Sequence, residues 1–157
     1  MKKRNAFVGA ILSIIPFGQP FLLKTGVFLL NTGSMIPLFE RVQASDSSYF
    51  FNRAYQKTEK GDYYGAISDY TKAIEINPQD GDAYNNRGNA KRKLKDNYGA
   101  IADYTKAIEI DPNDKQAYNN RGIAKEKIGD LNGACADWRK ASSLGNNLAT
   151  KSLRDQC

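Results

Sequence analysis

The chain has 157 residues, a net charge of +6 and no histidine. Its length suits one modest domain preceded by a separate segment, and the lack of histidine removes the most common general base and metal ligand, which argues against an enzyme and against a metal site. Most of the net positive charge lies in residues 1–44, which have five basic residues and one acidic residue. Residues 45–157 have 18 basic and 16 acidic residues, a near balance that argues against nucleic-acid binding.

The first 44 residues have the pattern of a targeting segment. Basic residues at 2–4 precede residues 5–39, in which Lys24 is the only charged side chain. A positive start, an apolar stretch and small residues before a cleavage point are typical of an export signal. The sequence therefore predicts a signal peptide or membrane anchor over residues 1–44, with a cleavage point between Ala44 and Ser45.

Three interpretations of this segment stay open. Cleavage would release an exported domain, retention would anchor the domain to the membrane through residues 6–39, and a helical hairpin would return the domain to the cytoplasmic face. A spanning helix needs about 20 apolar residues, and Lys24 divides the stretch into two shorter parts. We favour a single crossing that keeps the basic N-terminus in the cytoplasm, as the positive-inside rule requires, with the following domain on the other side.

The rest of the chain consists of three ungapped copies of one 34-residue unit, at residues 47–80, 81–114 and 115–148. The stretch GAISDYTKAIEI that begins at Gly65 returns at Gly99 with one change, and a weaker copy begins at Gly133. A fixed period of this length indicates a solenoid, in which each unit buries its apolar face against its neighbours. The stacked units are expected to form an extended concave surface, which suits binding better than catalysis.

Each unit is predicted to form two helices joined by a tight turn, which makes the fold all-α. An Asp in the turn suits the N-cap of the second helix, because its carboxylate accepts from free backbone N–H groups. Pro78 and Pro112 end the second helix in the first two units, because the residue before a proline avoids the α region. The predicted first helices span residues 47–60, 81–94 and 115–128. The predicted second helices span residues 63–76, 97–110 and 131–143. A capping helix is predicted over residues 147–157, with Leu148 and Leu153 facing inward.

Several positions of the unit keep their character in every copy: position 8 is small, position 24 is aromatic, and positions 20 and 27 are alanine. These residues are Ala54, Gly88 and Gly122; Tyr70, Tyr104 and Trp138; Ala66, Ala100 and Ala134; and Ala73, Ala107 and Ala141. The pattern resembles the tetratricopeptide repeat family. The resemblance implies a right-handed solenoid of helix pairs that binds proteins or peptides, with no enzymatic activity, cofactor or small-molecule substrate.

Within that family, the repeats are most similar to those of membrane-linked proteins in photosynthetic bacteria. This similarity implies a compartment of the periplasmic or thylakoid-lumen type, with the cytoplasmic face of the membrane as the alternative. It also implies a role in assembling or maintaining a membrane complex.

One departure from the family concerns charged residues. Position 7, usually Leu, is Arg in all three units, while position 23 is Asp. The two positions lie equally far from the turn, so they should sit at the same height in an antiparallel hairpin. We predict one Arg–Asp pair in each unit, and the alternative is two solvated charges that never meet. The predicted pairs are Arg53 with Asp69, Arg87 with Asp103, and Arg121 with Asp137.

The resemblance places the partner-binding groove on the first helices, where asparagine dominates. A row of carboxamides offers donors and acceptors to the backbone of an extended peptide. The predicted groove residues are Phe51, Asn52, Tyr55, Asn85, Asn86, Asn89, Arg92, Lys93, Asn119, Asn120, Ile123 and Lys127. For the Asn at position 6 of each unit (Asn52, Asn86 and Asn120), a role in the fold is an equal alternative.

Two further features of the groove limit the partner. Chaperone-binding members of the family hold a C-terminal carboxylate with a clamp of Lys, Arg and Asn, and of the matching positions here only Asn86 fits. Those positions are Phe51, Tyr55, Asn86, Gln116 and Asn120. The basic run at residues 91–95, together with Lys125 and Lys127, is either a patch for an acidic partner or a solvated face.

The two cysteines are Cys135, in the second helix of the last unit, and Cys157 at the end of the sequence. If the capping helix runs antiparallel to residues 131–143 after a turn at Gly145, both cysteines lie almost equally far from that turn. Their Cα atoms then fall within the range of about 4.4–6.8 Å that a disulfide needs. We favour a disulfide in an oxidising compartment; the alternative is a buried Cys135 and an unrelated free Cys157.

The leading functional hypothesis is a non-enzymatic adaptor that binds another protein or peptide in its groove. The alternative is a helical-repeat nucleic-acid-binding protein, which predicts binding that falls steeply with salt. No nucleophile–base pair, phosphate-binding loop or acidic dyad points to an enzyme.

Overall fold

The computed structural model describes residues 46–157, so the predictions for the targeting segment and its cleavage point at Ala44 and Ser45 lie outside the described residues. Within this range the chain forms seven α-helices and no strand. The helices are α2 (Ser47–Glu59), α3 (Tyr63–Ile76), α4 (Gly81–Lys93), α5 (Asn97–Ile110), α6 (Lys115–Lys127), α7 (Leu131–Ser143) and α8 (Asn147–Gln156). None of these helices combines the length and apolarity that a membrane crossing requires.

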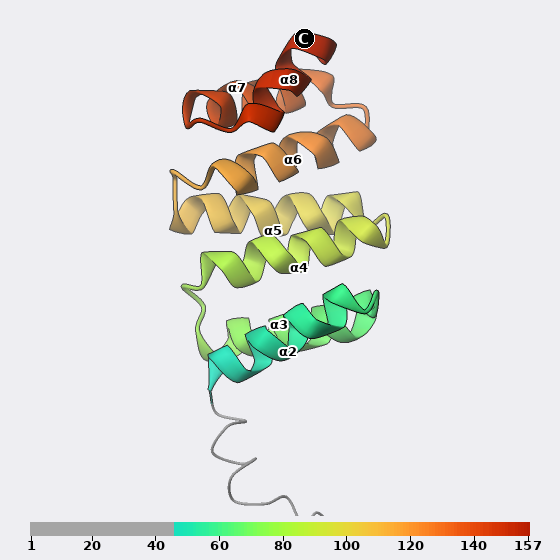
Figure 1. The fold of residues 1–157 in the computed structure, drawn as a ribbon, viewed down its shortest axis with the longest axis vertical. Coiled ribbons are helices and arrows are strands. Elements are labelled where there is room, and N and C mark those ends of the chain that lie inside the picture. Colours follow the sequence, from blue (N-terminus) through green and yellow to red (C-terminus); the bar gives the residue numbers. More distant parts are fainter. Residues whose placement is uncertain (1–45) are drawn as a thin grey trace, which may run out of the picture.

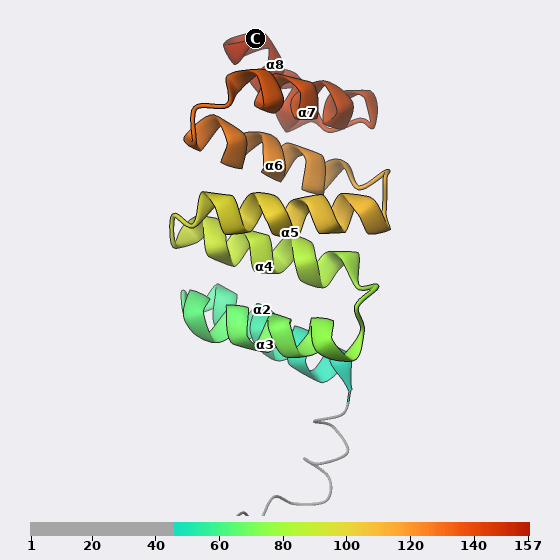
Figure 2. The same cartoon turned by 180° about the vertical axis from the view of Figure 1, so that it is seen from behind.

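The helices stack in chain order along one long axis (Figure 1). Each first helix packs on the second helix of its own repeat, each second helix packs on the first helix of the next repeat, and α8 packs on α7. Figure 1 shows α2 and α4 in front of α3 and α5, and Figure 2 shows the same stack from behind. In addition α2 contacts α4 and α4 contacts α6, whereas α3 and α5 have no comparable contact. The first helices are therefore closer together, which places the inner side of the stack on their face.

Every helix begins at a polar N-cap, and the predicted caps of the second helices are confirmed. The side chains of Asp62, Asp96 and Asp130 accept from the backbone N–H three residues later, which belongs to a glycine in each repeat. A Cβ on any of these glycines would overlap the cap carboxylate. The repeated Asp-x-x-Gly spacing therefore starts α3, α5 and α7 at the predicted residues.

The core of each repeat places a small residue of the first helix against an aromatic ring of the second. In the second repeat an added Cβ on Gly88 would lie 2.8 Å from Cε1 of Tyr104, and in the third a Cβ on Gly122 would lie 2.6 Å from Nε1 of Trp138. Both rings are almost fully buried. In the second and third repeats the two helices therefore approach so closely that a side chain larger than hydrogen would overpack the contact.

The C-terminal end carries a helix where the capping helix was expected, and one side chain on it differs from expectation. Asn146 stands where earlier repeats have proline, and it caps α8 by accepting from Ala149 N–H at 3.0 Å. The prediction that Leu148 faces inward is wrong, because its side chain is 71% exposed, whereas Ala149 is buried. Leu148 is the second residue of α8. The second residues of α4 and α6, Asp82 and Gln116, are also exposed.

Candidate functional site

The predicted Arg–Asp pairs are present in all three repeats. Arg87 donates through Nε and Nη2 to the two carboxylate oxygens of Asp103 at 2.9 and 2.7 Å. The pair of Arg121 with Asp137 has the same distances, and the pair of Arg53 with Asp69 has 2.7 and 2.6 Å. These bidentate bonds are the strong form of the interaction, because both oxygens of a buried carboxylate are satisfied.

A lysine completes each pair, which sequence reasoning missed. Lys57, Lys91 and Lys125 place Nζ 2.8–2.9 Å from the Asp of their own repeat. Each lysine follows the arginine by four residues on the same helix, so the signal was available as a helical-face pattern. Two of the lysines belong to the suggested basic patch, which is therefore partly neutralised by ion pairs.

The charged groups also join neighbouring repeats. Arg87 donates through Nη1 to the hydroxyl of Thr71 at 3.1 Å, and Arg121 donates to Thr105 in the same way. In the first repeat, which has no preceding repeat, Arg53 donates to the hydroxyl of Tyr49 instead. We refer to the three Arg–Asp–Lys groups with these threonines as the charge ladder. Since it links helices across the stack, the charge ladder is a structural element.

Electrostatics in the first repeat agree with a stable ion pair. Burial alone would raise the pKa of Asp69, but the hydrogen bonds and charges of Arg53 and Lys57 outweigh burial and hold that pKa below its ordinary value of 3.8. The hydrogen bond to Asp69 likewise raises the pKa of Arg53, despite the opposing effect of burial. Both partners therefore remain charged at neutral pH.

The predicted groove residues lie on α2, α4 and α6, the three helices that line the inner side of the stack. Asn52, Tyr55, Lys93 and Lys127 are exposed, whereas Phe51 is partly buried with its ring edge-on to Tyr70. The remaining members, except Asn119, are half-buried: Asn85, Asn86, Asn89, Arg92, Asn120 and Ile123. The predicted set therefore shares one face, but its members differ in how much of the side chain a partner can reach.

Three groove asparagines make bonds within the protein. Asn120 donates through Nδ2 to Oδ1 of Asn85 at 3.1 Å, which links α6 to α4. Asn89 accepts at 2.9 Å from the hydroxyl of Tyr104, toward which Arg92 also points its Nε at 3.4 Å. Burial raises the pKa of that tyrosine, and the bond from Arg92 opposes this only in part, so the hydroxyl stays protonated and able to donate.

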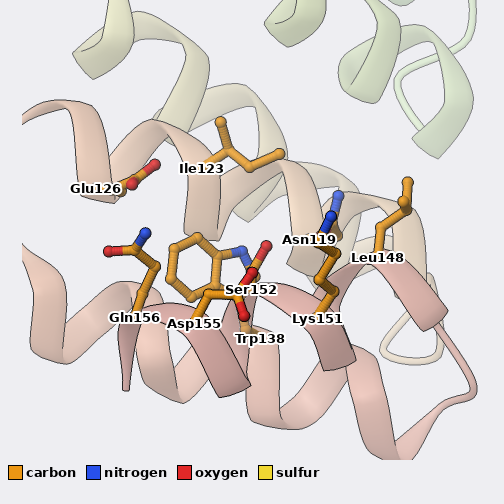
Figure 3. A pocket seen from close by; sticks show the side chains of 9 residues that line it. All are labelled: Asn119, Ile123, Glu126, Trp138, Leu148, Lys151, Ser152, Asp155 and Gln156. Atoms are coloured by element: carbon orange, nitrogen blue, oxygen red, sulfur yellow. The ribbon is translucent and has the colours of Figure 1, made fainter.

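At the C-terminal end of this face lies a pocket of about 360 Å³, shown in Figure 3. From α6 it is lined by Asn119 and Ile123, both predicted groove residues, together with Glu126. Trp138 of α7 and five side chains of α8 complete it: Leu148, Lys151, Ser152, Asp155 and Gln156. Neither Trp138 nor α8 was predicted to contribute to the binding face, because repeat-based reasoning assigns it to the first helices.

Two residues that line this pocket each carry a polar side-chain atom without a partner within the described residues. The atoms are Oδ1 of Asn119 and Nε1 of Trp138, both buried. Asn119 is 6% exposed and Trp138 is 1% exposed. Buried polar groups are nearly always hydrogen-bonded, so these two atoms mark the pocket as chemically incomplete.

The two cysteines form a disulfide that fastens α8 to α7. Cys135 and Cys157 are bonded through Sγ, with their Cα atoms 5.9 Å apart. Since α8 supplies one wall of the pocket, the disulfide also holds that wall in place. Residues 46–157 contain no group of three or more His, Cys, Asp or Glu side chains arranged to bind a metal ion.

Comparisons with known proteins agree on the family. Family models described as "Tetratricopeptide repeat" match residues 81–114 and 103–136, and one described as "TPR repeat" matches residues 54–95. No curated protein gives a significant match.

Solved structures provide further relatives. The Arabidopsis OM64 TPR domain is 30% identical and has a TM-score of 0.68, with 73% of this chain and 99% of that chain covered. The first TPR of Spaghetti (RPAP3), bound to HSP90 peptide SRMEEVD, is 26% identical with a TM-score of 0.68, over 71% and 90% of the two chains.

The second TPR domain of human RPAP3, in complex with HSP70 peptide SGPTIEEVD, is 29% identical with a TM-score of 0.65, over 73% and 95% of the two chains. The stacked helix pairs, the small-to-aromatic contacts inside each pair and these matches lead to one conclusion. The chain belongs to the tetratricopeptide repeat family.

Proposed function

We propose that this protein is a non-enzymatic adaptor that binds an extended segment of another protein along α2, α4 and α6. The observation that carries the proposal is the alignment of these helices on one face, with exposed polar and aromatic side chains such as Asn52 and Tyr55. Tetratricopeptide repeat structures that hold peptides support this function. Exposed groups between repeats can bond to a peptide backbone without requiring one particular side chain.

The segment that binds is proposed to be internal rather than a free C-terminus. The peptides in the two RPAP3 complexes end in EEVD. A terminal carboxylate requires cationic partners, and none of the five positions that match the family's clamp carries a Lys or Arg here: they are Phe51, Tyr55, Asn86, Gln116 and Asn120. The half-buried Asn86 is the single clamp residue retained.

The location of the adaptor is part of the proposal. We place the repeats on the non-cytoplasmic side of a membrane, either tethered by residues 6–39 or released after Ala44, in a compartment of the periplasmic or thylakoid-lumen type. The basic start and apolar stretch of residues 1–44 support this placement, and the disulfide between Cys135 and Cys157 is compatible with an oxidising compartment. A role in assembling a membrane complex, as in photosynthetic bacteria, follows from the same proposal.

The compartment is tested by fractionation of cells that express the tagged full-length chain, followed by protease treatment of the intact membranes. We expect the repeats to resist a protease added from the cytoplasmic side until the membrane is opened. Digestion before the membrane is opened would place the repeats on the cytoplasmic face and contradict this location.

The binding face is tested by photo-crosslinking from matched tyrosine positions. Tyr55 on α2 is 52% exposed, and Tyr64 and Tyr98, at the starts of α3 and α5, are 76% and 74% exposed. Each tyrosine is replaced in turn by p-benzoylphenylalanine in the full-length chain. We expect a protein to be captured from position 55 and not from positions 64 and 98. Equal capture from all three positions, or capture of nucleic acid from position 55, would refute the adaptor proposal.

A further inference from the structure

The pocket between α6, α7 and α8 lies where the regular stacking of the repeats is interrupted. In the stack α2 lies against α4 and α4 against α6, but α8 has no comparable contact with α6. Instead α8 packs on α7, and the pocket of about 360 Å³ opens between α8 and α6. Figure 3 shows side chains of both helices around the indole ring of Trp138.

One unsatisfied atom follows from a change within the third repeat. In the second repeat the aromatic hydroxyl of Tyr104 donates to Oδ1 of Asn89. The equivalent residues of the third repeat, 34 positions later, are Trp138 and Ile123. Isoleucine has no acceptor, so the indole Nε1–H of Trp138 is buried without a partner.

The other unsatisfied atom follows from a change in α8. Asn120, the sixth residue of α6, donates its carboxamide N–H to Oδ1 of Asn85 in the preceding repeat. The equivalent of Asn85 in the third repeat is Asn119, and the sixth residue of α8 is Ser152. Ser152 lines the pocket but makes no bond to Asn119, whose Oδ1 is therefore buried without a partner.

Both missing groups are parts of a carboxamide. In the second repeat a carboxamide oxygen satisfies the aromatic donor, and a carboxamide N–H satisfies the asparagine acceptor. We propose that the pocket is a subsite for the side-chain carboxamide of an asparagine or glutamine of the partner, with its C=O accepting from Trp138 Nε1 and its N–H donating to Asn119 Oδ1. The proposal rests on the adaptor function and adds the chemistry of one residue of the bound segment.

The same two atoms discriminate against charged side chains of similar size. A carboxylate has no proton to donate to Asn119, and it would enter a pocket that already holds Glu126 and Asp155 against one cation, Lys151. An ammonium group has no acceptor for the indole N–H of Trp138. An unpaired buried polar group costs roughly 1–3 kcal/mol, so selection for the carboxamide is expected to be about tenfold or more.

The test uses the single tryptophan of the full-length chain as a unique reporter. Butyramide, a small analogue of the glutamine side chain, is titrated into ¹⁵N-labelled protein while the indole N–H resonance of Trp138 is followed by NMR. We expect a saturable downfield shift, and a binding constant for butyrate at the same ionic strength that is about tenfold weaker. Absence of a butyramide shift, or equal titrations by the two probes, overturns the proposal.

A pair of variants at one position provides the matched control. Ile123→Asn gives Trp138 the acceptor that Asn89 gives Tyr104, and it should abolish the response to butyramide because the donor is then satisfied internally. Ile123→Leu keeps the apolar wall and should retain the response. A full response in a folded Ile123→Asn variant overturns the proposal, and if that variant does not fold, the comparison of butyramide with butyrate in the unaltered protein decides.

The experiment also separates this subsite from the adaptor function. Protein capture from position 55, together with no butyramide response at Trp138, overturns the subsite alone. A butyramide response without protein capture supports the subsite chemistry while refuting the wider binding face.

Discussion

The carboxylates of the charge ladder are buried side chains that each bind two cations. Asp103 is 4% exposed and binds both Arg87 and Lys91. Replacing an ion pair by apolar groups is often harmless, but removing one partner leaves an uncompensated buried charge. Here the loss of the Asp103 carboxylate would leave two cations without their counter-ion. One of them, Arg87, also carries the bond to Thr71 of the previous repeat.

We therefore expect Asp103→Asn to lower the free energy of unfolding by about 3 kcal/mol. Urea denaturation followed by circular dichroism measures this change. The control is Glu109→Gln, which removes an exposed ion pair with Lys106 and should change stability far less. Equal effects of the two substitutions would show that the charge ladder contributes no more than a surface ion pair.

The first repeat predicts how acid affects stability. The pKa of Asp69 lies below 3.8 in the folded protein, so as the pH falls the unfolded state takes up a proton first. The stabilisation from Asp69 is therefore complete above about pH 5 and decreases as the pH drops through 3.8 toward the lower, folded-state pKa. We expect the difference in unfolding free energy between the unaltered protein and Asp69→Asn to shrink over this window in urea titrations. A difference that stays constant from pH 6 to pH 3 would contradict this prediction.

Individual helices show why some features could be predicted and others could not. The starts of α3, α5 and α7 followed from the Asp N-caps in the turns, because capping is local and repeats with the sequence. The Arg–Asp pairs could be predicted because the arginine and the aspartate of each unit lie equally far from the turn between its two helices. The charge ladder lysines were missed because only two positions of the unit were paired in the prediction, although every copy carries the third.

The C-terminal helix was harder to predict because it has no copy elsewhere in the chain. The repeat pattern predicts the contacts between one unit and the next. The pocket at Trp138 arises where the third repeat lacks a group that the second repeat has, the carboxamide of Asn89. Leu148 was misplaced because it is the second residue of α8, a position that is also exposed in α4 and α6. Which groove side chains a partner contacts stays a prediction, since it depends on a molecule that the sequence does not describe.

Asn146 is expected to fasten α8 by two separable means. Its Oδ1 caps α8, while its Nδ2 donates to the carbonyl of Lys115 and to Oε1 of Gln116 at 3.2 and 3.0 Å. We expect Asn146→Ala to destabilise the protein by about 2 kcal/mol, measured by thermal unfolding. Asn146→Asp keeps the cap but loses both donors, so it should recover part of the loss. A loss from Asn146→Ala no larger than that from Asp96→Ala, an exposed cap, would show that the bonds to α6 contribute nothing.

The disulfide is expected to stabilise the same end of the molecule. It closes a sequence separation of 22 residues, for which loop entropy corresponds to about 3 kcal/mol. The double variant Cys135→Ser, Cys157→Ser should therefore unfold at lower denaturant concentration by that amount. A reducing agent should destabilise the unaltered protein equally and leave the double variant unchanged. Equal stability of the oxidised protein and the double variant would contradict the predicted contribution.

The stack as a whole behaves as a row of units that each depend on their neighbours. Within the described residues, α2 packs on α3 and α4 but has no repeat before it. The consequence is visible in the charge ladder: the side chain of Arg53 is 36% exposed, against 15% for Arg87 and 16% for Arg121. Local stability should therefore rise from the first repeat toward the centre of the stack.

Two nearly identical helices allow this gradient to be measured, because their amide hydrogens have nearly the same intrinsic exchange rates. α3 and α5 have 14 residues each and differ at two positions, Tyr63 against Asn97 and Ser68 against Ala102. We expect amide hydrogens of α3 to exchange at least about tenfold faster than their counterparts in α5, because opening the first repeat breaks contacts on one side only. Mass spectrometry of peptides from the two helices measures the ratio. Since sequence and helix length are matched, equal exchange would mean that the repeats open as one unit, and the nearest-neighbour description of this stack would be wrong.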